Sequence, residues 1–406
     1  MALLDKFLDC VSYDTQSSET TGTTPSTPGQ LVLGAHLVEV MKGIGIKDAH
    51  MDEKGYVYGS IPGNIPCAKK IGFLAHMDTS AEISGKDVKP RVIENYDGKD
   101  IVLNEELGIV TDLKNFPSLE NYKGKTIVVT DGTTLLGCDD KAGISIILQA
   151  CEEIIAKDLP HGDVKIAFTP DEEIGEGPNN FDVPGFDADF AYTIDGGAIG
   201  EVEYENFNGN SASVKVTGRS VHPGSAKNKM INAMTVAMEF HSMLPANEVP
   251  EHTDGYDGFT HLVEMKGDIE SAELHYIIRD HDKDLLNKKC DRLLKIGEYL
   301  NGKYDNQPVE VKIKESYLNM KEMILPHMYI IDLARESMLK NNVQPITMPI
   351  RGGTDGARLS FMGLPCPNLC TGGENFHGRH EFACVDDMEK IKDVVLTIIE
   401  NVQYIK

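Results

Sequence analysis

The stretch TDGTTLLGCDDKAG, residues 130–143, decides how the rest of the chain is organised. The short apolar run Ile127–Val129 precedes it, and the apolar composition of residues 144–156 after it predicts a buried helix. The acidic pair Asp139-Asp140 therefore lies where a strand passes into a helix. Such a junction predicts a position at the carboxyl end of a sheet, where open α/β folds place their sites. Helix capping alone is the alternative explanation for Asp139.

Polar side chains also end four other apolar runs. They are His76 and Asp78, Glu172 and Glu173, Asp195, and His377. Residues i and i+2 of an extended chain share a face, so His76 and Asp78 are expected to point the same way. That arrangement suits a histidine metal ligand held by a carboxylate, although a pair on the surface would have the same sequence. A solvated acidic turn is the alternative for Glu172-Glu173.

Two imidazoles and several carboxylates suit borderline divalent ions, chiefly Zn²⁺, with Co²⁺ or Mn²⁺ as substitutes. If Asp139, Glu173 and Asp195 are ligands, two such ions and one bridging hydroxide make the group about neutral. One ion would leave negative charge buried, which is costly. The count favours two ions, and it leaves Glu172 free to act as a general base.

Composition excludes some classes of partner. The chain has 406 residues, 41% of them hydrophobic, with 64 acidic against 39 basic residues and a net charge of −25. This charge argues against nucleic acid or an anionic membrane as a partner. The N-terminus, MALLDKFLDC, is not typical of a signal peptide, and the eight cysteines lack zinc-finger spacing. We therefore expect reduced thiols and a cytoplasmic location.

A second domain is predicted inside the first. From residue 208 the expected order of elements is β-α-β-β-α-β, the split βαβ or ferredoxin-like unit. The predicted boundaries are 1–207 for the first part of a catalytic domain, 208–320 for the insertion, and 321–406 for the second part.

Seven segments resemble those of one enzyme family, and the resemblance covers essentially the whole chain. The segments are HMDT, TDGTTLLGCDDKAG, FTPDEEIGEG, TIDGG, GRSVHPGSAKNKMINA, RGGTDGARLSFMG and GGENFHGRHEF. In this order they are similar to the aminoacylase/carboxypeptidase-type dinuclear zinc peptidases, and the last four point to the tripeptidase branch. The resemblance implies an α/β fold, in which a catalytic domain with a central mixed sheet carries an inserted ferredoxin-like α+β lid domain.

The resemblance also implies roles for the site residues. His76 and Asp195 would bind one zinc, Glu173 and His377 the other, and Asp139 would bridge them. His377 is preferred over His380 because the family's ligand lies four residues before a Glu, here Glu381. Asp78 would orient His76, and Glu172 would be the general base.

Three further residues are candidates for substrate binding. His222 would stabilise the oxyanion, and its alternative is an exposed loop histidine. Arg279 and Arg351 are candidates for the substrate carboxylate, since guanidinium binds carboxylate bidentately, and each is equally compatible with a structural ion pair. Cys138 departs from relatives that often have Ala there, and a small buried residue explains it best.

The activity implied is zinc-dependent release of the N-terminal residue from free tripeptides, by a metal-bridged hydroxide with a Glu base. The partner is a small peptide, and a homodimer is possible on the pattern of the family. The alternatives are a dipeptidase, carboxypeptidase or N-acyl amino acid deacylase with the same metal site, or a metal- or peptide-binding protein without catalysis.

Overall fold

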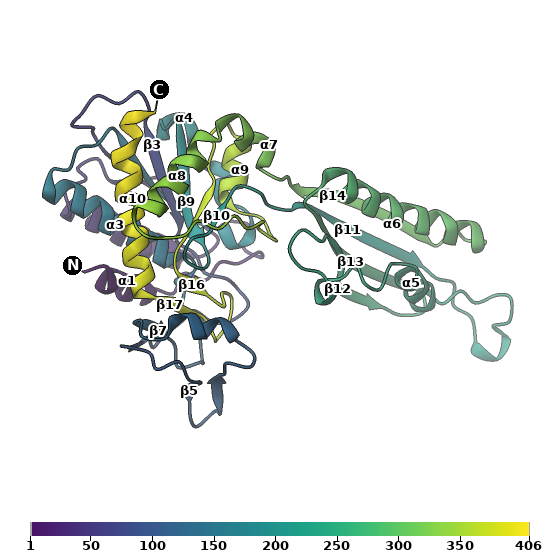
Figure 1. Ribbon diagram of the computed structural model, residues 1–406. Coiled ribbons are helices and arrows are strands. Elements are labelled where there is room, and N and C mark those ends of the chain that lie inside the picture. The colour runs from purple at the N-terminus through teal and green to yellow at the C-terminus, as the bar shows by residue number, and fades with distance from the viewer. Residues whose placement is uncertain (1, 406) are drawn as a thin grey trace. The chain divides into compact units, whose positions relative to one another are not determined.

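The computed structural model describes residues 2–405, which form two units (Figure 1). Unit 1 comprises the chain up to Tyr204, Glu322–Met348, and the chain from Thr354 onward. Unit 2 comprises Glu205–Lys321 and the short segment Pro349–Gly353. That segment lies within the 321–406 predicted for the first domain, so the structure corrects this part of the prediction. Ile350 N donates to Glu205 O (2.8 Å), which explains the grouping.

Unit 1 is built on a mixed seven-stranded sheet. Its strands, in spatial order, are β1 (His50–Met51), β2 (Val57–Ile61), β8 (Val164–Thr169), β3 (Ile71–His76), β9 (Phe190–Gly196), β15 (Asn368–Cys370) and β10 (Val202–Glu203). The four strands β8, β3, β9 and β15 are parallel, and each of the flanking strands pairs antiparallel with its neighbour. Every residue of β3 is buried, as expected for a parallel strand covered on both faces.

Helices cover both faces of this sheet. The helices of unit 1 are α1 (Leu3–Val11), α2 (Pro28–Gly43), α3 (Cys138–Lys157), α4 (Val183–Phe186), α8 (Tyr329–Lys340), α9 (Asp355–Phe361) and α10 (Val385–Asn401). Helix α7 (Lys321–Ile324) begins at Lys321, where the longer segment of unit 2 ends. Helix α3 packs on β3 and β9, and α10 packs against both α3 and α8 (Figure 1). On the other face Phe181 and Phe186 pack with α9 residue Leu359 around Leu74.

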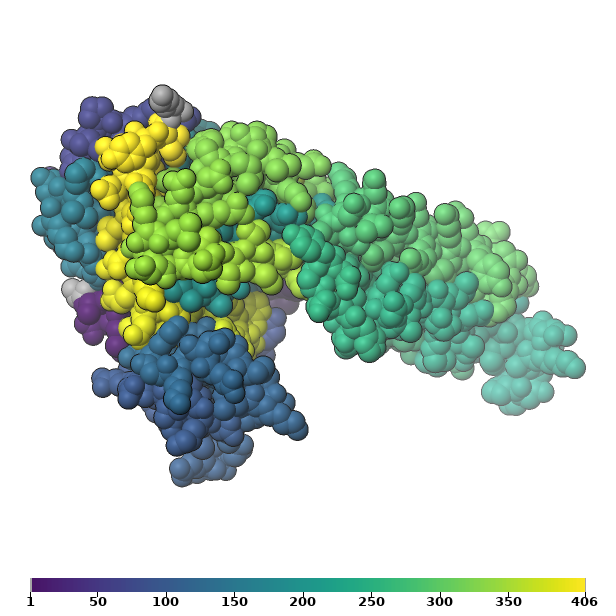
Figure 2. Space-filling model, viewed as in Figure 1, coloured from purple at the N-terminus to yellow at the C-terminus, as the bar shows by residue number. Residues whose placement is uncertain are grey.

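The strand before Asp139 does not belong to the central sheet, which corrects the position predicted for this residue. Strand β7 (Ile127–Val129) lies in a separate antiparallel sheet with β4 (Arg91–Ile93), β17 (Phe382–Cys384) and β16 (Gly373–Glu374). The hairpin β5 (Ile101–Asn104) and β6 (Ile109–Thr111) adjoins it in sequence, and residues 91–122 form a blue lobe of unit 1 in Figure 2. Asp139 therefore reaches the central sheet from the start of α3.

Unit 2 is an antiparallel four-stranded sheet with two helices. Its elements are β11 (Asn208–Thr217), α5 (Ala233–Ser242), β12 (Phe259–Gly267), β13 (Ser271–Asp280), α6 (Lys283–Lys303) and β14 (Val309–Tyr317). The spatial order β12-β13-β11-β14 in a β-α-β-β-α-β chain is that of a split βαβ unit. One apolar core, which includes Phe240 and Leu293, joins the two helices to the sheet.

No helix within residues 2–405 is long and apolar enough to cross a membrane. All eight cysteines are free thiols, and seven of them are buried.

Candidate metal centre

Three neighbouring parallel strands bring polar residues to one edge of the central sheet. His76 ends β3, Glu172 and Glu173 follow β8, and Asp195 lies in β9. Thr169 of β8 pairs with His76, and Thr193 of β9 pairs with Leu74, so Asp195 lies level with His76. The carboxyl ends of parallel strands meet at this edge, where α/β sheets bind ligands.

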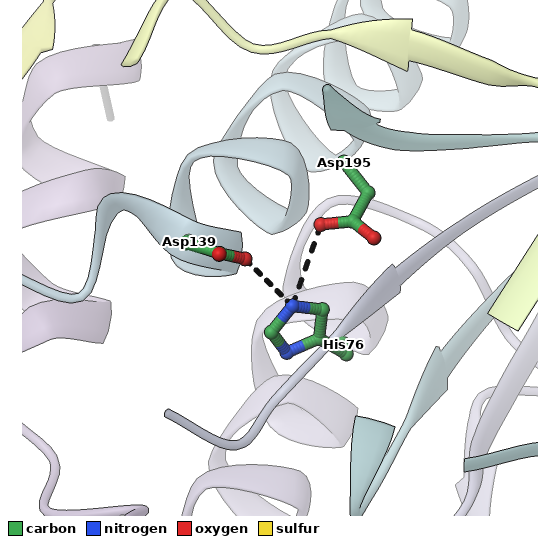
Figure 3. A group of neighbouring side chains, drawn as sticks. All are labelled: His76, Asp139 and Asp195. Atoms are coloured by element: carbon green, nitrogen blue, oxygen red, sulfur yellow. Dashed lines mark hydrogen bonds and ion pairs between the residues drawn. The ribbon is translucent and has the colours of Figure 1, made fainter. Parts of the chain in front are cut away.

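The first group of ligand atoms is buried. His76 Nε2 lies 2.8 Å from Asp139 Oδ1 and 3.4 Å from Asp195 Oδ1, and both aspartates point at the same ring nitrogen (Figure 3). The other ring nitrogen, Nδ1, is 3.0 Å from the backbone oxygen of Asp78. Only 2% of the His76 side chain is exposed. This group can hold a metal ion through one nitrogen and two carboxylates.

The second group shares Asp139 with the first. His377 Nε2 lies 2.9 Å from Glu173 Oε2 and 3.3 Å from Asp139 Oδ2. Thus the two oxygens of Asp139 face different histidines, as a bridging ligand requires. In each group the ligand atoms lie within 4.8 Å of one another. The His377 side chain is 41% exposed, much more than that of His76.

The donor set fits divalent cations. Glu173 Oε1 is buried and has no hydrogen-bond partner among the described residues, so this carboxylate has an unused acceptor beside His377. Hydrogen bonds to Asp139 and Glu173 raise the pKa of His377 to about 11, and burial raises the pKa of Glu173 to about 8. Neighbouring carboxylates cause the His377 shift, and burial without a compensating positive charge causes the Glu173 shift. A bound cation would offset both effects.

Asp78 holds the loop that carries the two glutamates. Its Oδ1 accepts from Glu172 N (2.9 Å) and its Oδ2 accepts from Glu173 N (3.1 Å). Asp78 Oδ1 also lies 3.5 Å from His76 Nδ1, and the Asp78 side chain is fully buried. Burial raises the pKa of Glu172 well above its usual range. One carboxylate thus connects the end of β3 to the turn after β8.

Comparisons with known proteins show the family of the chain. The model of peptidase family M20/M25/M40 matches residues 116–401. The chain is 54% identical to "Peptidase T" of Clostridium perfringens over 98% of each chain. The chain belongs to peptidase family M20/M25/M40. It is therefore an enzyme, a metallopeptidase of the M20 type.

Two solved structures show the same fold as the M20 peptidase chain. Aminopeptidase PepT from Bacillus cereus has a TM-score of 0.77 at 20% identity, over 98% of both chains. A dinuclear metal-binding peptidase of the M20 family from Bacillus subtilis has a TM-score of 0.66 at 13% identity, over 100% of this chain and 98% of the other.

In the M20 peptidase chain, the structure brings His377 rather than His380 into the second group. His380 Nδ1 instead lies 2.9 Å from Thr111 Oγ1, and its ring packs against Phe116 at 4.6 Å between centroids. Cys138 is buried, burial raises its pKa well above the usual range, and its Sγ would lie 2.4 Å from a Cβ at Gly373. This neutral thiol is a packed core residue.

The three candidates for substrate binding all lie in unit 2. His222 is exposed, and its Nδ1 accepts from Gly224 N (3.1 Å). Arg279 donates to the backbone oxygen of Asn210 (3.0 Å) and stacks over Tyr317 at 5.0 Å. Their substrate roles stay predictions.

Arg351 is held by the backbone of a loop in the same unit. It donates to Gly255 O (2.8 Å), Asp257 O (2.9 Å) and Thr253 Oγ1 (3.0 Å). None of these partners is a carboxylate, so they do not form the structural ion pair that was the alternative for Arg351. Its role in substrate binding also stays a prediction.

Several further buried carboxylates, to which the sequence analysis gave no role, surround the centre. Asp140 Oδ2 accepts from His76 N (3.2 Å), and Asp355 Oδ2 accepts from Thr169 Oγ1 (2.7 Å). Glu381 accepts three backbone N–H groups of the loop before α3. All three carboxylates lie in segments quoted for the family resemblance, and Asp140 is also marked by its place in the acidic pair at the start of the predicted helix.

Proposed function

We propose that this chain is a zinc-dependent aminopeptidase that releases the N-terminal residue from free tripeptides, with Glu172 as general base. The observation that carries the proposal is the pair of ligand groups that share Asp139. Glu172 lies beside them, in the loop that Asp78 holds. A shared carboxylate suits two ions, and nitrogen with oxygen donors suits zinc, with Co²⁺ or Mn²⁺ as substitutes.

Each ion would have its own set of ligands, with Asp139 in both. His76, Asp139 and Asp195 would hold one ion, and Asp139, Glu173 and His377 the other. Such ions polarise a carbonyl oxygen and lower the pKa of a bound water. Asp78 fixes the ring of His76 and the backbone of the base loop, so both keep their positions during turnover.

Glu172 moves the proton. Its carboxylate accepts a proton from the attacking water, whose oxygen forms a bond to the carbonyl carbon of the first peptide unit. The same proton then goes to the amine nitrogen as the carbon–nitrogen bond breaks, which leaves a free amino acid and a dipeptide. Substrate length and end specificity rest on the resemblance to the tripeptidase branch. The free state of all eight cysteines supports a cytoplasmic location.

The test identifies the reaction products and compares the activity of the wild type with that of one variant. The zinc-loaded protein is incubated with a tripeptide and matched di- and tetrapeptides, and the products are identified by mass spectrometry. We expect one amino acid and one dipeptide from the tripeptide alone. Glu172→Gln should lower kcat by about 10² to 10⁴-fold while zinc stays bound. Glu176→Gln, an exposed residue of the same loop, is the control and should keep its activity.

Other products would contradict the proposed tripeptidase activity. Cleavage of the dipeptide, release from the C-terminal end, or hydrolysis of an N-acyl amino acid would assign a sibling activity. Near-normal turnover by Glu172→Gln would overturn the role of this residue.

A further inference from the structure

Glu381 joins two loops of the metal centre. It directly precedes β17, four residues after His377, and only 1% of it is exposed. Its Oε2 accepts from Leu136 N (2.7 Å) and Gly137 N (2.9 Å), and its Oε1 accepts from Asp139 N (3.1 Å). Hydrogen bonds from backbone N–H to an ionised carboxylate are stronger than neutral ones.

The loop that Glu381 holds needs an external acceptor. Gly137 has φ +79°, so the backbone turns sharply just before Asp139. Buried N–H groups without partners are costly, and here three of them converge on one carboxylate. Phe382 of β17 pairs with Val129 of β7, which brings Glu381 next to the strand that leads into this loop. Glu381 thus sets the place from which Asp139 reaches the centre.

The two ligand groups depend on this link to different degrees. On the His76 side Asp139 has a second anchor, because the adjacent Asp140 accepts from His76 N (3.2 Å). Helix α3 also meets β9 so closely that a Cβ at Gly143 would lie 2.0 Å from Ile194 O. On the other side, the loop of His377 runs directly into Glu381, and His377 itself has φ +60°.

We propose, on the basis of the two-ion function above, that Glu381 is a positioning residue for the ion site formed by Asp139, Glu173 and His377. It aligns the Asp139 loop with the His377 loop before an ion arrives. The site of His76, Asp139 and Asp195 depends on it much less. In Glu381→Gln the side-chain amide group cannot accept, so at least one of the three N–H groups faces a donor.

The experiment titrates metal-free protein with Zn²⁺ by calorimetry, in the wild type, Glu381→Gln and a control. The control is Asp387→Asn, which removes a fully buried carboxylate elsewhere in unit 1, where Lys125 donates to it (2.8 Å). We expect two ions in the wild type and in the control. In Glu381→Gln the second ion should bind about 10 to 100-fold more weakly, with the first little changed.

A double-mutant cycle separates positioning from a general loss of structure. Adding Glu381→Gln to His377→Ala should weaken metal binding no further, whereas its effect should persist in His76→Ala. Equal weakening of both ions, or the same loss in Asp387→Asn, would overturn the proposal.

The same titration distinguishes failure of the two-ion function from failure of the role proposed for Glu381. A wild type that takes up one ion overturns both proposals, whereas two ions bound unchanged in Glu381→Gln overturn only the role of Glu381. If circular dichroism shows that Glu381→Gln is unfolded, Glu381→Asp decides by the same titration, because its shorter carboxylate cannot span all three N–H groups.

Discussion

The two ligand groups share one aspartate but are built on different kinds of backbone. His76 and Asp195 stand on the neighbouring parallel strands β3 and β9, and the His76 side chain is 2% exposed. His377 stands on the loop between β16 and β17, and its side chain is 41% exposed. The first group is held by a buried sheet, whereas the second depends on a loop at the surface of the centre.

The support behind each histidine differs in the same way. His76 Nδ1 is 3.0 Å from Asp78 O, and Asp78 is fully buried. His377 Nδ1 is 3.5 Å from Glu82 Oε1, and Glu82 is 62% exposed. A site on rigid elements with a fixed outer shell loses less freedom when it binds an ion. We therefore expect a tight ion at His76 and a weaker one at His377.

Removing each histidine in turn gives the largest expected effect. His76→Ala should weaken the tighter ion by more than about 100-fold, beyond the loss typical of an outer-shell change. His377→Ala should remove the weaker ion and leave the tighter one bound. Competition with a calibrated chelator measures both constants, with the exposed His252→Ala as a control. Loss of the tighter ion in His377→Ala would reverse the comparison.

Asp78 supports the buried site from behind His76 and also holds the backbone of Glu173. Asp78→Asn keeps the shape of the side chain but removes the charge beside His76 Nδ1. Its amide nitrogen cannot accept, so either Glu172 N or Glu173 N loses its acceptor. We expect metal affinity at the His76 site to fall about 10 to 100-fold. Asp182→Asn, whose carboxylate accepts from Gly185 N at the start of α4, is the matched control. Equal affinity in Asp78→Asn and wild type would show that the strand alone holds His76.

Glu201 is a partly buried carboxylate outside both ligand groups, and its burial lowers the stability of the protein when the carboxylate is charged. Burial raises its pKa to about 7, above its value in an unfolded chain. The associated stability is full below pH 4.5 and is lost as pH rises through about 7. Glu201→Gln should therefore match the wild type at pH 4.5 and exceed it at pH 8.5 by about 1 kcal/mol, below the roughly 3 kcal/mol of the full shift. Urea unfolding of metal-free protein at both pH values checks this, and equal stability at pH 8.5 would contradict it.

The smallest effect is expected at the surface of the second group. Glu82→Gln removes the charge beside His377 Nδ1, but both side chains are exposed and the interaction is screened. We expect the weaker ion to lose less than about 1 kcal/mol of binding free energy, and less still at high salt. A loss as large as that in Asp78→Asn would mean that the two outer shells are equivalent.

The parts of the centre that the sequence could predict are those on the central strands. Buried parallel strands are continuous apolar runs, and His76, Glu172 and Asp195 each end one, so their common edge follows from the pattern. The three-residue run of β7 contains no such information. Its pairing of Val129 with Phe382 joins distant parts of the chain, so its place in a separate sheet could not be predicted.

The burial of individual carboxylates was the other feature that the sequence could not predict. Acidic residues in loops are usually solvated, so nothing in the local pattern distinguished Glu381 or Asp355 from a surface residue. Their burial depends on backbone N–H groups and hydroxyls that the fold brings to them. Likewise, Arg351 lies in a segment predicted for one domain but holds a loop of the other, through carbonyl groups that no spacing rule identifies.

The position of unit 2 in the chain has a consequence for biosynthesis. His76, Asp139 and Asp195 all precede Glu205, where unit 2 begins, whereas His377 follows its last segment, Pro349–Gly353. Chains leave the ribosome from the N-terminus, and domains begin to fold in that order. The residues of the buried site are therefore made before the whole of unit 2, and His377 only after it. The order of synthesis thus coincides with the order in which we expect the two ions to bind.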